Sequence, residues 1–149
     1  MAGWLIISSE QNLGITARLE FKYQGLKHRH RKKAMKVAPG DVFFYYITGE
    51  QKLAAMTRIR SFVEEGSEKI WVNLGKDPNE HYPWRFEMEP LVVLDKSDWL
   101  PMENFSTSLI HFRKWPEKYW RLGLQGQIHA LREEDMETLQ TALRSAETP

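Results

Sequence analysis

The hydrophobic positions of this chain fall into short runs and alternating stretches that are typical of β-strands. Val42–Ile47 is β-branched or aromatic throughout, which favours a strand buried on both faces. Turn residues occupy positions 39–41 before it, and residues 48–51 reverse the chain into a second predicted strand over residues 53–59. The pattern therefore predicts a central β-hairpin.

Weaker patterns of the same kind predict further strands on both sides of the hairpin. They cover residues 4–7, 21–24, 70–74 and 84–94. Pro90 interrupts the last of these, which indicates an edge position or a β-bulge because proline cannot donate to a sheet ladder. A short apolar strand at residues 4–7 also places Trp4 in the core.

Helical spacing is clearest near the end of the chain. Leu131, Met136, Leu139 and Leu143 repeat at three to five residues, and acidic residues in the first turn match the helix dipole, so we predict a helix over residues 131–145. A shorter helix is expected over residues 10–19 after a serine N-cap. The expected architecture is α+β: a mostly antiparallel mixed sheet of five or six strands with short helices and a C-terminal helix.

Composition narrows the class of protein. The chain has 149 residues, 42% hydrophobic and 28% charged, which suits one domain that buries roughly two thirds of its unfolded surface. The absence of cysteine excludes disulfides, thiolate nucleophiles and cysteine-ligated zinc. The first residues lack the pattern of a signal peptide or a membrane span. We therefore expect a soluble, cytoplasmic protein without a membrane partner.

The charge is unevenly distributed, although the net charge is only +1. Six lysine and arginine side chains and two histidines lie between Lys27 and Lys36 with no acidic residue among them. A solvated loop has this composition, and so does a patch that contacts nucleic-acid phosphates.

No motif of a known catalytic centre stands out. The chain has no His-Glu-x-x-His sequence, no phosphate-binding glycine-rich loop and no Gly-x-Ser-x-Gly elbow. Cationic neighbours surround His28 and His30, which disfavours a divalent metal there. We expect neither a metal nor a cofactor, and the sequence gives little support to an enzyme.

Several segments together resemble the EVE domain family of the PUA-like superfamily, which is related to YTH domains. They are WLIISSEQN, FKYQGLKHRHRKKAMKVAPGDVFFYYITG, HYPWRFEMEPL and LREEDMETL, in this order. The resemblance covers nearly the whole chain and implies a single EVE-like domain over residues 1–149. It implies a small, curved, partly closed β-barrel with surrounding helices, and a function in reading modified nucleobases that are flipped into an aromatic pocket.

The resemblance also suggests positions for a base pocket, although this chain has Ile7 where many relatives have lysine. The expected pocket residues are Ser8, Ser9, Asn12, Tyr23, Gln24, Gly25, Trp71 and Trp84. Hydroxyl and amide groups of the first three would hydrogen-bond a base edge. Tyr23 would stack on the base, with Trp84 or Trp71 on its other side. Phosphates would be contacted by Lys27, Arg29, Arg31, Lys32, Lys33 and Arg85.

Three functional hypotheses remain open at this point. The favoured one is a nucleic-acid-binding reader of methylated or hydroxymethylated bases, in DNA or RNA, without catalysis and working beside a separate nuclease or modifying enzyme. The second is an RNA-binding or RNA-modifying PUA-like protein that acts on tRNA or a small nucleotide, for which Asp41 or His28 would supply acid–base chemistry. The third is a protein-interaction module that uses exposed Trp115 and Trp120.

Overall fold

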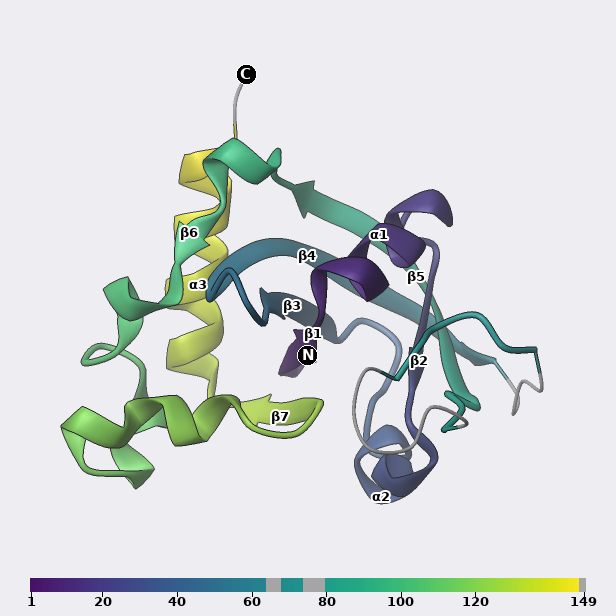
Figure 1. Cartoon of the computed structure of the whole chain (residues 1–149), viewed down its shortest axis with the longest axis horizontal. Coiled ribbons are helices and arrows are strands. Elements are labelled where there is room, and N and C mark those ends of the chain that lie inside the picture. Colours follow the sequence, from purple (N-terminus) through teal and green to yellow (C-terminus); the bar gives the residue numbers. More distant parts are fainter. Residues whose placement is uncertain (64–67, 74–79, 148–149) are drawn as a thin grey trace.

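The computed structural model describes residues 1–63, 68–73 and 80–147, and its centre is a strongly curved mixed sheet (Figure 1). Six strands follow the order β2-β5-β4-β3-β1-β7, and β6 pairs with β4. The strands are β1 (Gly3–Ser8), β2 (Tyr23–Leu26), β3 (Val42–Ile47), β4 (Lys52–Val63), β5 (Trp84–Val93), β6 (Leu100–Pro101) and β7 (Ile128–Leu131).

The predicted central hairpin is confirmed. Strand β3 has the predicted bounds, is buried along its whole length, and pairs antiparallel with β4 from Val42 opposite Arg58 to Ile47 opposite Lys52. The pairing register shifts between Tyr45 and Tyr46. A bulge of this kind increases local twist, which fits the curvature of the long β4 strand.

One pairing in the sheet is parallel and positions the candidate site. Strand β1 pairs parallel with β3, from Gly3 opposite Val42 to Ser8 opposite Ile47, and pairs antiparallel with β7 on its other side. The carboxyl ends of β1 and β3 therefore meet at one edge of the sheet. There the Thr48 backbone N–H donates to the Ser8 carbonyl oxygen at 2.9 Å.

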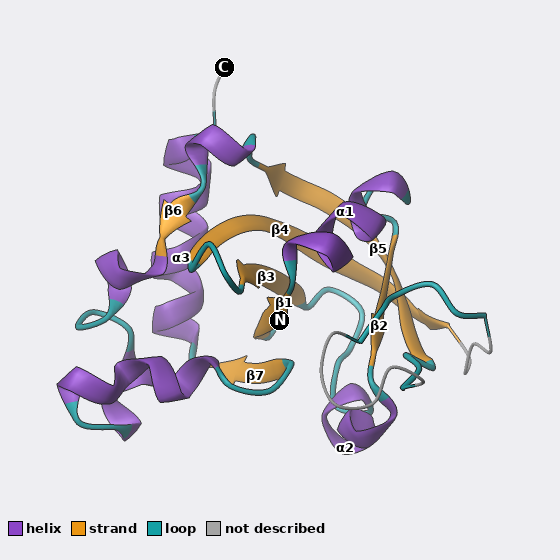
Figure 2. Ribbon diagram, viewed as in Figure 1, coloured by secondary structure: helices purple, strands orange, loops and turns teal. Residues whose placement is uncertain are grey.

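Helices and 3₁₀ turns surround the sheet (Figure 2). The α-helices are α1 (Glu10–Arg18), α2 (Arg31–Ala34) and α3 (Glu133–Ala146). The 3₁₀ segments are η1 (His28–His30), η2 (Lys96–Asp98), η3 (Met102–Phe105), η4 (Ile110–Lys114) and η5 (Glu117–Leu124). Helix α3 buries Met136, Leu139 and Leu143, as its spacing predicts. None of the helices in the described ranges is long and apolar enough to cross a membrane.

The structure corrects three of the predicted elements. Residues 70–73 form no strand, and residue 74 lies outside the described residues. Strand β2 begins at Tyr23 because Phe21 has a positive φ of 56° in the preceding turn. Helix α3 begins at Glu133, since Leu131 ends strand β7, which was not predicted. Of the two alternatives predicted at Pro90, an edge position or a bulge, the structure shows a bulge, because the β4–β5 register shifts between Met56 and Thr57, opposite Val92 and Pro90.

Candidate nucleic-acid interface

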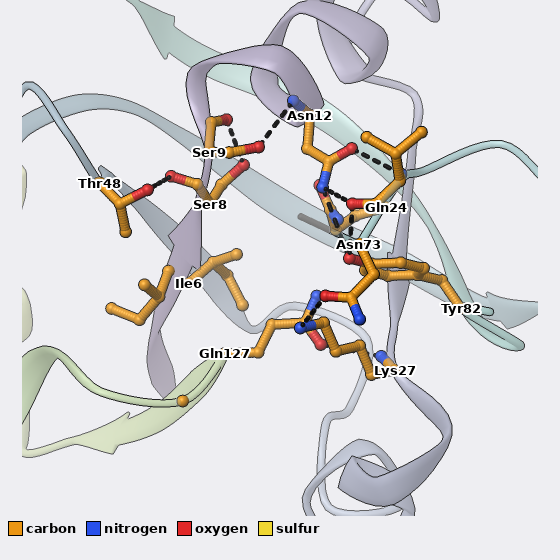
Figure 3. Close-up of a pocket in the computed structure, with 13 residues that line it drawn as sticks. Ile6, Ser8, Ser9, Asn12, Gln24, Lys27, Thr48, Asn73, Tyr82 and Gln127 are labelled. Atoms are coloured by element: carbon orange, nitrogen blue, oxygen red, sulfur yellow. Dashed lines mark hydrogen bonds between the residues drawn. The ribbon is translucent and has the colours of Figure 1, made fainter. Parts of the chain in front are cut away.

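A cavity of about 210 Å³ opens at the edge where β1 and β3 end (Figure 3). Its lining is mostly polar, with Ile6, Ile7 and Val72 as apolar patches. The other lining residues are Ser8, Ser9, Asn12, Gln24, Lys27, Thr48, Asn73, Tyr82, Gly126 and Gln127. The volume is below the roughly 300–1,000 Å³ of typical ligand pockets, so the cavity suits one small planar group.

Hydroxyl groups form one side of the cavity. The Ser8 hydroxyl donates to the Ser9 carbonyl oxygen at 2.9 Å, and Ser9 Oγ accepts from the Asn12 backbone N–H at 3.1 Å as the N-cap of α1. Thr48 is exposed beside them and follows β3 directly. Because Ser9 Oγ acts as an acceptor in the cap, its hydroxyl proton is still available to donate to a ligand.

A hydrogen-bonded cluster of Asn12, Val72 and Tyr82 forms the opposite wall. Asn12 Oδ1 accepts from the Val72 backbone N–H at 2.8 Å, and Asn12 Nδ2 donates to the Val72 carbonyl oxygen at 2.7 Å. The Tyr82 hydroxyl donates to the same carbonyl at 3.0 Å. Asn12 therefore positions the wall, and its amide is already engaged with the backbone rather than open to a base edge.

Lys27 brings a positive charge into the cavity. Its Nζ donates to Asn73 Oδ1 at 3.1 Å and lies 6.0 Å from the centroid of the Tyr82 ring. Gln127 fixes the start of this segment, since its Oε1 accepts from the Lys27 backbone N–H at 2.8 Å. Burial is the main cause that lowers the pKa of Lys27, and nearby Glu80 partly opposes this effect.

The inner end of the cavity rests on a buried polar network. Gln24 Oε1 accepts from the hydroxyls of Thr16 at 3.1 Å and Tyr45 at 3.0 Å, and Gln24 Nε2 donates to the Gly25 carbonyl oxygen at 2.9 Å. Trp71 Nε1 donates to Thr16 Oγ1 at 3.0 Å. These bonds satisfy groups that would be costly to bury alone.

The structure brings together about half of the residues expected at the base pocket. Ser8, Ser9, Asn12 and Gln24 line the cavity, and so does Lys27, which was expected at a phosphate. The lining does not include Tyr23, Gly25, Trp71 or Trp84.

The expected aromatic sandwich is not assembled around the cavity. Tyr23 is 40% exposed and neighbours Gln24 on β2, so alternation along the strand turns its side chain away from the cavity. Trp71 is only 1% exposed, and Trp84 donates from Nε1 to the His28 carbonyl oxygen at 2.9 Å. Among the described residues of the lining, Tyr82 is the one with an aromatic side chain.

The basic segment lies beside the cavity on η1 and α2. Lys32 and Arg31 are exposed, and the Arg31 guanidinium lies 5.8 Å from the Trp84 ring centroid. Lys33 Nζ donates to the Ile128 carbonyl oxygen at 2.7 Å, and Arg29 lies 3.9 Å from a Glu80 carboxylate oxygen.

Arg85 has a different environment from these cations. It is buried, and its guanidinium donates to the carbonyl oxygens of Tyr82 and Glu68. It also lies 5.6 Å from the Trp71 ring centroid. Arg85 therefore stabilises the segments around the cavity wall, whereas Arg29, Arg31 and Lys32 are exposed to solvent.

Two histidines near this basic segment are held in the neutral form. Burial lowers the pKa of His30 to about 4, with further lowering by Arg29 and Lys33. Burial also lowers the pKa of His129 to about 4, against a raising effect of the hydrogen bond to Gln125. Both imidazoles are therefore neutral near neutral pH, and they add no positive charge to that of the lysine and arginine side chains.

The residues considered for the alternative hypotheses lie away from the cavity. The Asp41 carboxylate accepts from Ala2 N, Trp4 Nε1 and Ala38 N at 2.9–3.0 Å, which makes it a turn-stabilising group. His28 packs on Trp84, with 5.6 Å between ring centroids. Trp120 is buried against Phe112, so it cannot contribute to an exposed interaction patch. Within the described part of the chain, no cluster of three His, Asp or Glu side chains could hold a metal.

Four lining residues with polar side chains were not identified from the sequence: Thr48, Asn73, Tyr82 and Gln127. Thr48 could have been found if β1 and β3 had been paired in parallel, because the carboxyl ends of parallel strands meet. Tyr82 lies within the HYPWRFEMEPL segment that carries part of the family resemblance, although it was not named as a pocket residue. Asn73 and Gln127 lie in loops, where the sequence offers no comparable signal.

Comparison with known proteins agrees with this architecture. The EVE domain family model matches residues 2–140. The YTH domain of Zygosaccharomyces rouxii MRB1 in complex with N6-methyladenosine RNA has a TM-score of 0.66 at 10% identity, and the match covers 96% of this chain and 86% of that one. A complex of the YTH domain-containing protein mmi1 with RNA has a TM-score of 0.65 at 11% identity, with coverages of 97% and 83%.

A bacterial protein gives a similar match. The Pseudomonas putida structure has a TM-score of 0.61 at 14% identity, covering 95% of this chain and 99% of that one. None of the curated proteins compared with this chain matches it. The likeness to these solved structures supports the curved α+β fold of PUA-like type that the sequence predicts.

Proposed function

Because the chain belongs to the EVE domain family, we propose that it is a nucleic-acid-binding module that takes one modified nucleobase into the cavity beside Lys27. The observation that carries the proposal is the cavity itself, which is small, polar and placed at the edge where β1 and β3 end. The RNA complexes among the YTH structures of similar fold support a nucleic-acid partner.

The proposed base lies between the serine side and the Tyr82 side of the cavity. Lys27 and the Ser9 hydroxyl donate to acceptor atoms on the base edge, while Ile6 and the Tyr82 ring contact its apolar surface. Extrusion of a base costs a few kcal/mol, so contacts to the flanking phosphates are needed as well. The exposed cations Arg31 and Lys32 provide these contacts next to the cavity.

The side chains that line the cavity favour binding over catalysis. The described lining contains no carboxylate and no imidazole, and the two acid–base candidates, Asp41 and His28, make structural contacts elsewhere. Recruitment of a separate nuclease or modifying enzyme belongs to the same proposal, because a reader without chemistry of its own needs a second protein to act on the site.

A binding titration tests the proposal. The purified protein is titrated with short RNA and DNA strands that carry methyladenine, methylcytosine, hydroxymethylcytosine or no modification. We expect a preference for one modified base that Lys27→Met weakens about 10–100-fold, in line with roughly 1.5–3 kcal/mol for a hydrogen bond from a charged donor.

The matched control is Lys22→Met, which removes the same charge from an exposed residue paired with Glu20. This variant should bind the modified strand as the unaltered protein does, apart from a small uniform loss. Binding that ignores modification, or a Lys27→Met variant indistinguishable from Lys22→Met, would overturn the proposal.

A further inference from the structure

A second cavity of about 270 Å³ lies at the far end of β7, between η4 and the start of α3. Three cationic side chains line it, Arg113 and Lys114 from η4 and Arg132 from the residue after β7. Ile110 and Ala130 give it apolar surface. A cavity that combines several cations with apolar walls suits a group that carries a negative charge on an apolar body.

The described lining of this cavity holds one carboxylate against three cations, so the positive charge is in excess. Asp135 is 1% exposed, and its two oxygens accept from the backbone N–H groups of Ile110 at 2.8 Å and His111 at 2.9 Å. Arg132 lies 3.6 Å from a Glu134 carboxylate oxygen in an exposed pair, which contributes little in water. Arg113 and Lys114 are exposed and have no ion pair with any residue in the described ranges.

Strand β7 connects the two cavities. Gln127 lines the first cavity, and Ala130 and Arg132 line the second. At about 3.3 Å per residue, the five residues from Gln127 to Arg132 span roughly 16 Å. Figure 1 shows β7 running from the side of α2 towards the foot of α3, at the end of the sheet.

Further cations lie along this path. Lys33 Nζ donates to the Ile128 carbonyl oxygen at 2.7 Å, so it lies at the start of β7. Lys114 belongs to η4, which lies against β7, since the ring centroids of His111 and His129 are 5.0 Å apart. The series Lys27, Lys33, Lys114 and Arg132 thus leads from the first cavity to the second.

We propose that the second cavity binds the sugar and phosphate of a nearby nucleotide on the same strand whose modified base occupies the first cavity. The inference rests on the proposed function and extends it, because it assigns a direction to the bound strand: along β7 towards α3. The cations contact the phosphates, and Ile110 and Ala130 contact the sugar. Single-strand binding by a track of cations is strongly salt dependent, since each neutralised phosphate releases counterions.

The test compares strand lengths and two matched double variants. The variant Arg113→Ala with Lys114→Ala removes two charges from the second cavity. The control Lys118→Ala with Arg144→Ala removes two exposed charges that line neither cavity. Each protein is titrated at several salt concentrations with a modified mononucleotide, a modified heptanucleotide and an unmodified heptanucleotide.

We expect the modified mononucleotide to bind both double variants with the same affinity as the unaltered protein. The heptanucleotide should bind the second-cavity variant several-fold more weakly than the control, with a salt slope smaller in magnitude by about 1.4 for two lost phosphate contacts. Amide NMR signals of Ala130 and His111 should shift with the heptanucleotide and not with the mononucleotide.

Other outcomes separate the two proposals. If the mononucleotide binds but the heptanucleotide gains nothing, or if both double variants behave alike, the second cavity is not part of the site and the first proposal stands. If the unmodified heptanucleotide binds through the second cavity and the modified base does not change the affinity, the second cavity is a nucleotide-binding site but the base-reading function fails.

Discussion

Asn12 is joined to the backbone of Val72 by two hydrogen bonds, one in each direction, at 2.8 and 2.7 Å. The side-chain amide of Asn12 makes the hydrogen bonds that a neighbouring β-strand would otherwise make. The apolar segment around Val72 can therefore line the cavity without pairing with a strand of the sheet. The backbone groups of half-buried Val72 thereby remain satisfied.

We expect Asn12→Ala to destabilise the protein by about 1–3 kcal/mol, because it leaves the Val72 backbone N–H without its partner and the Val72 carbonyl oxygen with the Tyr82 hydroxyl alone. Urea unfolding measures the change, with exposed Gln11→Ala on the same helix as the control. Hydrogen exchange at the Val72 amide should accelerate in Asn12→Ala. An unchanged exchange rate would show that the amide pair does not hold this wall.

Two glycines should respond in opposite ways to alanine. A Cβ at Gly25 would lie 2.6 Å from Trp71 Cζ3 and 2.9 Å from Tyr82 Cβ, so Gly25→Ala should cost about 1–3 kcal/mol by overpacking and should disturb the cavity wall. Gly14 lies in α1, where the nearest atom to an added Cβ is 4.0 Å away on flexible Arg18.

Gly14→Ala should therefore stabilise the protein by up to about 1 kcal/mol through helix propensity. Thermal unfolding of both variants makes the comparison, and base binding should weaken only in Gly25→Ala. Equal melting temperatures for the two variants would contradict the close packing of Trp71 on Gly25.

The neutral histidines predict a pH dependence of stability. The pKa of His30 and of His129 is lowered from 6.5 to about 4, so the unfolded chain binds more protons than the folded one between these values. This contribution to stability is complete above about pH 6.5 and decreases as the pH falls towards 4.

Urea midpoints measured between pH 4 and 8 should therefore fall on the acid side, and the double variant His30→Gln with His129→Gln should show a flatter curve. The control is His81→Gln, which changes an exposed imidazole and should keep the original pH profile. A double variant whose midpoint falls with acid as steeply as that of the unaltered protein would assign the pH dependence to other groups.

The elements that could be predicted are those whose order of apolar and polar residues directly reflects which side chains are buried. Strand β3 matches its predicted bounds, and the apolar stripe of α3 is buried as expected. Residues 70–73 also look like a strand by propensity, but their backbone pairs with Asn12 through a side chain, and no local pattern reveals that. Strand β7 has only four residues and is separated from helix α3 by one residue, the N-cap, so it is too short for an alternating pattern to be visible.

The same limit applies to the site. Ser8, Ser9 and Asn12 are adjacent in sequence, and the family resemblance identifies them together. Tyr82 and Gln127 reach the cavity from loops that are distant in sequence, so only the tertiary fold brings them together. Tyr23 is expected at the base from the resemblance alone, and the proposed function does not place the base there, because its exposed ring lies on the other face of β2 from the cavity-lining Gln24.

Mapping the bound base by NMR tests the central claim most directly. The protein is titrated with a short strand that carries the preferred modified base, and contacts between base protons and the protein are recorded together with amide shifts. Our account predicts contacts to Ile6 and the Tyr82 ring, with the largest shifts at Ser8, Ser9 and Gln127. Contacts to Tyr23 and shifts along the β2 face beside Glu87, with none in the cavity, would contradict it.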